Sequence, residues 1–450
     1  MNDKPAIVQP APLAGDAAVS SRQLALWVLV FVSAMSTIDR QVMPLLLSPI
    51  QKEFQLTDGE SGLLGFVFGL FFGLGTIPLA MLADRRARRK LISLCLGGFS
   101  ACTWLCGLAP SFAWLVGGRI GVAAGEAAVT PAAHSMIADL FPPAERSFAM
   151  AKFVLGSKIG AVVAYLLGGW LSDWFGWRNT FIIIAIPGLL VALAAWRMRE
   201  PPRGGSDNLQ PAAARSFSVR ALVEDLAQLR GNRTFWYLFF SNCAAGLFGL
   251  GAIFWLPIFL ERNFGMPSGE AGTYMAVYTI VFGMSGVVII GWIASKLTTR
   301  DIRWGLWILA LMLAIALPSA WLMFFTTSRT ILMFAAMVPM FVSSSALGPV
   351  AAMIQTVVPV GIRSTSAGIM QVGNGISLAM GPLIVGLISQ FFSSYGEQSI
   401  RYALLSLSTL WVLTLIGYLL ASRSLKRDIA TANPASLATD DPSDGRAAAV

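Results

Sequence analysis

Apolar runs long enough to cross a membrane recur along the whole chain. A helix of about 20 apolar residues spans a hydrocarbon core roughly 30 Å thick. The pattern predicts twelve such segments, at residues 24–47, 61–83, 91–109, 113–138, 148–171, 179–198, 234–260, 270–295, 304–325, 330–354, 364–391 and 400–421. We therefore expect an all-α polytopic membrane protein.

Composition excludes a soluble globular protein. Hydrophobic residues make up 56% of the 450 positions and charged residues 12%, about half the charged fraction that is usual in soluble domains. Most of the 32 Lys and Arg residues fall on the side of the membrane that would hold both termini, and segments rich in basic residues stay in the cytoplasm. The net charge of +9 is thus a topology signal, and it gives no reason to expect a nucleic-acid partner.

One long polar interruption divides the segments into six and six. Within it, the stretch "SFSVRALVEDLAQLRGN" repeats its apolar positions at helical spacing, as in a helix lying on a membrane surface. This organisation predicts five parts: an N-terminal cytoplasmic segment, a six-helix bundle, a cytoplasmic linker with an amphipathic helix, a second six-helix bundle and a disordered tail, at residues 1–23, 24–198, 199–233, 234–421 and 422–450.

The two halves resemble each other in register. Gly59 and Gly62 lie 210 positions before Gly269 and Gly272, and the segment containing Gly169 lies 217 positions before its counterpart. Chance similarity between apolar helices would match Leu and Val, whereas these matches are mostly Gly and charged residues. A parallel repeat of this kind predicts two pseudo-symmetric six-helix bundles that rock against each other.

Several motifs carry a family resemblance. "LADRRARRK" and "GWRNTF" resemble signature motifs of the major facilitator superfamily, and "IDR", "FQLTDGESGLL", "GRIGVAAGEAAVTPAAHSMIADLFPPAERS" and "REPPRG" resemble the spinster group within it; these motifs occupy residues 82–90, 176–181, 38–40, 54–64, 118–147 and 199–204. The resemblance implies the twelve-helix major facilitator fold and a transport function. The spinster group includes transporters of sphingolipids and lysophospholipids.

The loop between the second and third segments is a candidate gating loop, with Asp84, Arg85 and Arg88. Asp84 could pair with Arg88 or cap the N-terminus of a neighbouring helix, where a carboxylate is stabilised. A pairing that exists only when the cytoplasmic side is shut would bias the conformational equilibrium. The alternative is that the basic residues only set the topology and contact lipid headgroups.

Asp39 and Arg40 lie inside the first apolar segment. Each costs roughly 2.5–3.5 kcal/mol at a helix centre, so the pair cancels about as much as the apolar residues of the segment gain. Both should therefore point into the bundle. Arg119 and Glu126 are seven residues apart in the fourth segment and share one helix face, so we expect Asp39 to face both of them.

This cluster suggests a proton site. Our hypothesis is that Asp39 and Glu126 bind the coupling proton, while Arg119 stabilises their charged forms as long as the site is hydrated. The alternative is a set of structural ion pairs that lock helices together without a role in transport.

Substrate-binding candidates lie in both halves. The buried charges sum to a positive value, which favours an anionic or zwitterionic substrate group near Arg40 or Lys158; Lys158 could instead form another interhelical pair. Asn242, Gln371 and Asn374 are uncharged polar residues at interior depths of the second half. They could join helices by hydrogen bonds or anchor a substrate in an otherwise apolar wall.

Together these features favour a proton-coupled secondary active transporter that moves an amphiphilic or anionic organic solute by alternating access. Alternatives are a symporter of a small organic anion, such as a sugar acid or aromatic acid, and a non-transporting receptor on the same fold. With one histidine, no convincing metal or nucleophile cluster and no phosphate-binding loop, an enzyme is disfavoured. We expect a monomer in a bacterial-type inner membrane, with the solute, protons and lipid as partners and no cofactor or metal.

Overall fold

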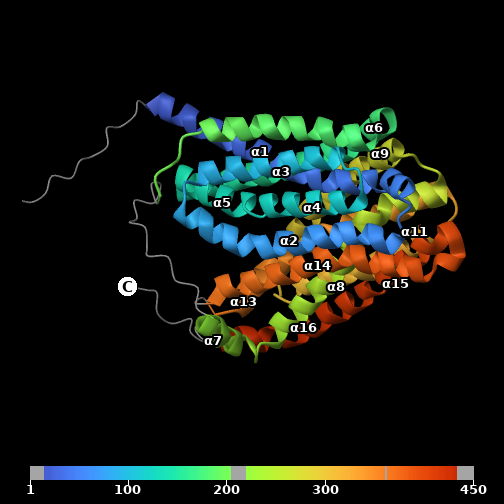
Figure 1. Cartoon of the computed structure of the whole chain (residues 1–450). Helices are drawn as coiled ribbons and strands as arrows, with labels where there is room; N and C mark the ends of the chain where they lie inside the picture. Colours follow the sequence, from blue (N-terminus) through green and yellow to red (C-terminus); the bar gives the residue numbers. More distant parts are fainter. Residues whose placement is uncertain (1–14, 204–218, 360–361, 433–450) are drawn as a thin grey trace, which may run out of the picture.

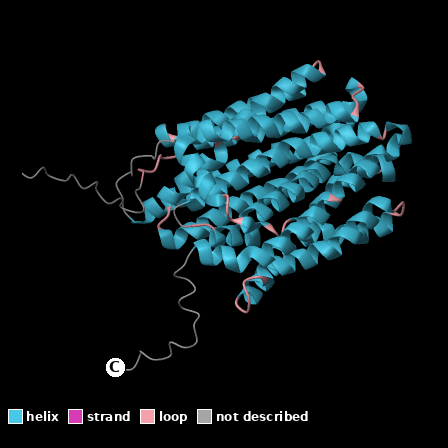
Figure 2. Ribbon diagram, turned by 90° about the horizontal axis from the view of Figure 1, so that it is seen from below, coloured by secondary structure: helices cyan, strands magenta, loops and turns pink. Residues whose placement is uncertain are grey.

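The computed structural model describes residues 15–203, 219–359 and 362–432, and over these ranges helices are the only regular secondary structure (Figures 1 and 2). The first half contains α1 (Gly15–Phe54), α2 (Asp58–Arg85), α3 (Arg88–Gly107), α4 (Phe112–Glu126), α5 (Val129–Leu140) and α6 (Pro143–Arg197). A short amphipathic helix, α7 (Val219–Leu229), follows between the two halves.

The second half begins with α8. Its helices are α8 (Arg233–Phe264), α9 (Ser268–Tyr278), the π-helix η1 (Thr279–Met284), α10 (Ser285–Thr298), α11 (Trp304–Phe325), α12 (Arg329–Ser343), α13 (Leu347–Val357), α14 (Arg363–Phe391), the 3-10 helix η3 (Ser393–Gln398), α15 (Ser399–Ser408) and α16 (Leu410–Ala432). Helices α9, η1 and α10 run on from one another as one membrane crossing.

Eleven continuous helical stretches within the described residues are long and apolar enough to cross a membrane. One of them, α6, contains two crossings, because Gly176 interrupts it with non-helical angles (φ 78°, ψ 161°). Glycine tolerates a positive φ that other residues avoid. The all-α fold is therefore confirmed, and twelve crossings are consistent with it.

Helix ends differ from the expected boundaries at both termini. Helix α1 already begins at Gly15, within the predicted segment 1–23, and α16 continues to Ala432, within the predicted disordered tail 422–450. The extension of α16 has a local cause, since Asp428 Oδ2 accepts hydrogen bonds from the backbone N–H and the hydroxyl of Thr234, both 2.8 Å, at the start of α8. Residues 433–450 lie outside the described ranges.

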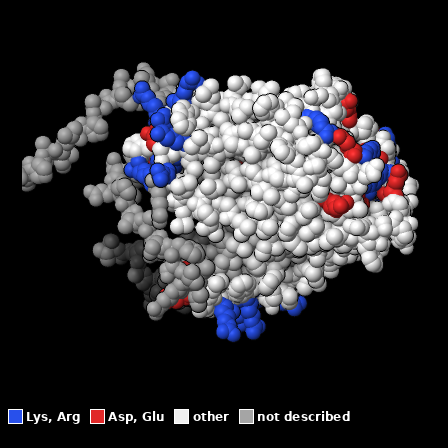
Figure 3. Space-filling model, viewed as in Figure 1, with Lys and Arg blue, Asp and Glu red and all other residues white. Residues whose placement is uncertain are grey.

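The molecule has two charged ends. We call the end that carries the start of α1, the α2–α3 connection and α7 the linker end, and the opposite end, which carries the α1–α2 connection, the distal end (left and right in Figure 1). Figure 3 shows Lys, Arg, Asp and Glu gathered toward these ends, with a largely uncharged belt between them on the face in view. Such a belt is what a lipid bilayer requires.

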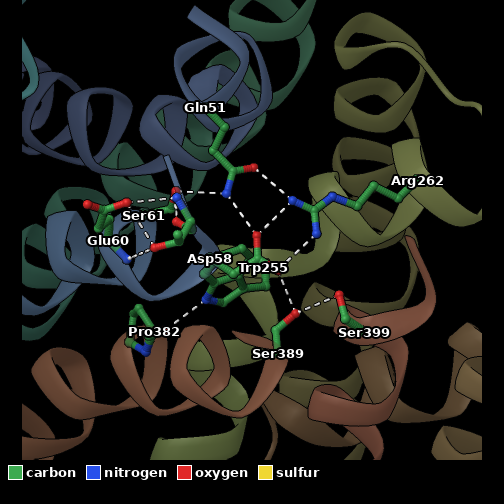
Figure 4. A network of polar contacts seen from close by, with 10 residues as sticks. Gln51, Asp58, Glu60, Ser61, Trp255, Arg262, Pro382, Ser389 and Ser399 are labelled. Atoms are coloured by element: carbon green, nitrogen blue, oxygen red, sulfur yellow. Dashed lines mark hydrogen bonds and ion pairs between the residues drawn. The ribbon is translucent and has the colours of Figure 1, made fainter. Parts of the chain in front are cut away.

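The two bundles are joined at the distal end by a polar network (Figure 4). Arg262 of α8 forms a bidentate pair with Asp58 of α2, at 2.7 and 2.9 Å, and also donates to Gln51 Oε1 at 3.1 Å. Ser389 of α14 donates to Asp58 at 2.6 Å. In the described part of the chain, the hydrogen bonds that we see between the bundles all lie at this end.

The glycines of the sequence repeat mark the closest approaches between the bundles. A Cβ on Gly62 would lie 2.8 Å from the carbonyl oxygen of Pro382, and a Cβ on Gly272 would lie 2.1 Å from that of Tyr165. Gly62 and Gly272 are 210 positions apart, and Tyr165 and Pro382 are 217 apart, so one contact is the repeat of the other. The glycines repeated in the sequence therefore lie where the backbones of the two bundles meet at the distal end.

Prediction. Gly62→Val should lower the free energy of unfolding by about 1–3 kcal/mol, because its side chain would collide with the α14 backbone. Gly73→Val on the same helix is the matched control, since nothing lies within 4 Å of the position of its Cβ. Thermal melting of both purified variants measures the difference; equal melting temperatures would contradict the contact.

Candidate functional site

Four charged side chains lie inside the first bundle, on α1 and α4. Asp39 is 2% exposed, Arg119 2% and Glu126 1%, whereas the Arg40 side chain is 33% exposed. Burial of this degree makes a partner obligatory for each charge, because an unpaired charge in an apolar interior is strongly destabilising.

Asp39 pairs with Arg119. Arg119 Nη1 lies 2.9 Å from Asp39 Oδ2, and the hydroxyl of Thr103 donates to Asp39 Oδ1. Each carboxylate oxygen of Asp39 thus accepts one hydrogen bond. Asp39, Thr103 and Arg119 together join α1, α3 and α4.

Glu126 pairs with Arg40. Arg40 Nη2 lies 2.7 Å from Glu126 Oε2, and Ser36 donates to the same oxygen at 3.1 Å. The other carboxylate oxygen, Oε1, is buried and has no hydrogen-bond partner in the described structure. A proton or a water molecule added at such a buried oxygen removes the free-energy cost of leaving the oxygen without a hydrogen bond.

The predicted single cluster of Asp39, Arg119 and Glu126 is therefore two adjacent pairs. The reason is helix geometry: consecutive residues point about 100° apart, so Asp39 and Arg40 leave α1 in different directions. Sequence reasoning left the role of Arg40 open, and the structure places it on Glu126. Ser36 was missed, although it lies one turn from Arg40 and that spacing would have indicated it.

Two aromatic residues of α2 complete the site and were also missed. The guanidinium of Arg119 lies 4.9 Å from the ring centroid of Phe68, and that of Arg40 lies 5.5 Å from Phe68 and 4.8 Å from Phe72. Cation–π contacts of this kind stabilise a desolvated cation. Phe68 thus lies against both cations. In the sequence, only the i, i+4 spacing of Phe68 and Phe72 indicated that the two rings share one face of their helix.

Both bundles have a broken helix at corresponding positions. Helix α4 ends at Glu126 before α5 begins, and α12 ends at Ser343 before α13 begins. Glu126 and Ser343 are 217 positions apart, the same separation as Gly169 and Gly386. In membrane transport proteins built from repeats, helices interrupted at corresponding positions are associated with binding sites.

The polar residues of the second bundle form a chain across α8 and α14. Asn242 Nδ2 donates to Asn374 Oδ1 at 2.7 Å, and Asn374 Nδ2 donates to Gln371 Oε1 at 2.8 Å. Asn242 and Asn374 are half-buried, while Gln371 is exposed. The structure thus brings these three candidates together and leaves the Gln371 end accessible.

Lys158 stands apart from these groups. It is half-buried on α6, and we see no hydrogen bond or ion pair to it among the described residues. The neighbouring Ser157 instead shares a 2.8 Å hydrogen bond with Thr37 of α1, so the α1-facing side of α6 does not include Lys158.

In the candidate gating loop, Arg88 is 2% exposed and binds within its own half. It pairs with Asp139 of α5 and, at 3.2 Å, with Glu200 beyond α6. Neither acid was singled out from the sequence. The side chains of Asp84 and Arg85 lie outside the described part of the structure.

Comparison with known proteins decides the family. The family model for the Major Facilitator Superfamily matches residues 29–319. The chain belongs to the major facilitator superfamily. The predicted fold and family are confirmed, and members of this superfamily are generally transporters rather than enzymes.

Three similar proteins refine this placement. An MFS-type efflux pump of Mycolicibacterium smegmatis is 30% identical over 90% of this chain and 94% of its own length. A cis,cis-muconate transport protein of Acinetobacter baylyi is 28% identical over 56% of this chain and 62% of its own. A bacterial homologue of the human lysosomal transporter spinster, solved inward-facing and occupied, is 28% identical with a TM-score of 0.78, covering 91% of this chain and 98% of its own. The chain is thus a spinster-like integral membrane protein.

Prediction. Asp39→Asn should destabilise the protein by about 3–5 kcal/mol, because it leaves Arg119 buried without a counter-charge. The double variant Asp39→Asn with Arg119→Gln should recover part of this loss, since neither charge remains. Thermal melting in detergent measures Asp39→Asn, Arg119→Gln and the double variant. The largely exposed pair of Lys52 with Glu261 supplies a control in Lys52→Gln, which should change little. A double variant that loses as much as the two single variants together would show that the pair is not coupled.

Proposed function

We propose that this protein is a proton-coupled secondary active transporter that moves an organic solute with an anionic group by alternating access. The observation that carries the proposal is the asymmetric binding of Glu126, with one carboxylate oxygen held by Arg40 and Ser36 and the other buried without a partner. A carboxylate bound in this way can accept a proton without first losing an existing hydrogen bond.

Protonation of Glu126 would free Arg40. The guanidinium would lose its counter-charge, while one third of its side chain is already exposed. An anionic substrate group can then take the place of the carboxylate. Proton and anion therefore favour each other's binding, which is the linkage that a symporter needs.

Asp39 belongs to the same proposal as a second proton acceptor. Its pair with Arg119 contacts the same Phe68 ring as Arg40 does, so movement of one pair disturbs the other. Each oxygen of Asp39 already accepts a hydrogen bond, from Thr103 or Arg119, so protonation of Asp39 would weaken its pair with Arg119.

The substrate is proposed to lie between the two bundles. Arg40 and Lys158 supply positive charge from the first half, and the amide chain Asn242–Asn374–Gln371 supplies polar anchors from the second. An amphiphile with an anionic headgroup fits this division and the likeness to a spinster homologue. A small organic anion is the second candidate, supported by the likeness to a muconate transport protein.

We assign the linker end to the cytoplasm of a bacterial-type inner membrane, with both termini on that side, because most of the basic residues lie there. With the distal end closed by Arg262 and Asp58, the protein would then be inward-facing. In this assignment the loop of Asp84, Arg85 and Arg88 is a cytoplasmic gate, with Arg88 anchored on Asp139 and Glu200.

Prediction. Glu126→Gln should abolish substrate-driven proton uptake, because glutamine keeps the shape of the side chain but cannot bind the proton. The assay uses purified protein in liposomes containing a pH-sensitive dye, after thermal-stabilisation screening with oleoyl lysophosphatidate and cis,cis-muconate as probes. Glu145→Gln, an exposed acid in the first turn of α6, is the matched control and should behave as wild type.

Undiminished proton uptake by Glu126→Gln would overturn the assignment of the proton site. A wild-type protein that is stabilised by a probe but moves neither probe nor protons would instead support the receptor alternative.

A further inference from the structure

Two helix crossings close the distal end, and they are repeats of each other. We call the crossing of α2 with α14 the first seam, and the crossing of α6 with α9 the second seam; η1 continues from α9 toward the linker end. A Cβ on Gly386 would lie 2.4 Å from the carbonyl oxygen of Asp58 in the first seam, and a Cβ on Gly169 would lie 2.1 Å from that of Ser268 in the second. At the distal end the two seams are therefore equally tight.

The seams differ closer to the middle of the membrane. In the first seam, Gly69 still approaches the backbone of α14, with its Cβ position 2.5 Å from Ala379. The counterpart of Gly69 in the second seam, 210 positions later, is Thr279, where the π-helix begins. The second seam thus has no glycine at the depth where the first seam is still in backbone contact.

Lys158 lies on the α6 side of the second seam, about one helical turn further toward the linker end. It lies 7 and 11 positions before Tyr165 and Gly169, whose backbones contact α9, so all three share one face of α6. The two helices run antiparallel. The contact of Gly69 with Ala379 in the first seam corresponds to Thr279 and Val162 in the second, and Lys158 lies one helical turn from Val162 toward the linker end. The repeat counterpart of Lys158 in the first seam is Gly375.

The π-helix, which closure at the linker end would bring toward Lys158, offers no counter-charge. The π-helix has the sequence "TIVFGM", and the hydroxyl of Thr279 is already donated to the carbonyl of Met275 at 2.8 Å. The carboxylates at this depth of the first bundle, Asp39 and Glu126, bind Arg119 and Arg40 instead. Closing the second seam toward the linker end would therefore press an ammonium group against apolar side chains.

We propose that Lys158 is a charge wedge in the second seam: it prevents the inner half of the seam from closing on the π-helix until an anionic group of the transported solute neutralises it. The inference deepens the proposed function and rests on it. Burial of an uncompensated ammonium is strongly unfavourable, whereas a neutralised pair can be buried.

In this proposal, closure of the second seam depends on whether an anionic solute is bound. An empty carrier keeps Lys158 hydrated and stays open at the linker end, whereas a carrier with bound anion can close and proceed. Lys158 is thus a positioning and specificity residue that selects solutes by charge, separate from the Arg40–Glu126 pair that senses the proton.

Prediction. Without any added ligand, Lys158→Met should raise the ratio of closed to open molecules at least tenfold. The readout is the distance between spin labels at Ser147→Cys on α6 and Ser295→Cys on α10, both exposed positions, in a lipid-reconstituted background lacking the four native cysteines. Lys158→Arg should keep the open distribution, because it retains the charge.

A carboxylate built into the π-helix should replace the solute's anion. Thr279→Asp places a negative charge at the start of the π-helix, about one turn from the position of Lys158, and should close the seam without ligand, whereas the isosteric Thr279→Asn should not. Lys152→Met is the control for removing a lysine from α6, since Lys152 lies over the rings of Trp27 and Phe148 instead; it should leave the distances unchanged.

Identical distance distributions for wild type and Lys158→Met would overturn the proposal, as would equal effects of Thr279→Asp and Thr279→Asn. Loss of proton uptake in Glu126→Gln is measured separately. A result that contradicts the proposed role of Lys158 can therefore be distinguished from one that contradicts the proposed proton site.

Discussion

The Glu126–Arg40 pair is the interaction on which the central part of the molecule depends. A carboxylate at 1% exposure inside an apolar bundle is tolerated only with a counter-charge, and this pair fixes where α1 and α4 meet. The same pair leaves one carboxylate oxygen without a partner and one guanidinium partly exposed. Stability and chemistry are therefore joined in one contact: the arginine that makes burial possible is also the cation that a proton would release.

A second constraint is the backbone contact at the distal end. Glycines related by the internal repeat let α2 meet α14 and α6 meet α9 closely enough to exclude side chains, and the Asp58–Arg262 pair joins the bundles beside them. Tight packing has few intermediate arrangements, so bundles held in this way tend to move as rigid bodies. Symmetric closure at one end, together with asymmetric side chains nearer the middle, allows the two seams to serve different purposes.

Departures from the repeat coincide with the positions for which we propose functional roles. Where the first half has Glu126, the second has Ser343; where the second half has Gly375, the first has Lys158. Among the described residues, the charged side chains away from the helix ends thus belong to the first bundle, while the second contributes amides at corresponding depths. A solute between the bundles would meet charge on one side and neutral polar groups on the other, and this division follows from substitutions at otherwise equivalent sites.

The sequence by itself determined the fold class, the two-bundle organisation and the membership of the family, because hydrophobic periodicity, the repeat of glycines and the loop motifs are local signals. It also identified Asp39, Arg119 and Glu126 as a group, since their insertion cost demands partners. Only the tertiary structure decided which partner each takes, because the direction in which Asp39 and Arg40 leave α1 depends on how the helix is rotated against α3 and α4. For the same reason the sequence did not indicate the roles of Phe68, Thr103 and Arg262, because these roles arise from contacts between helices far apart in the sequence.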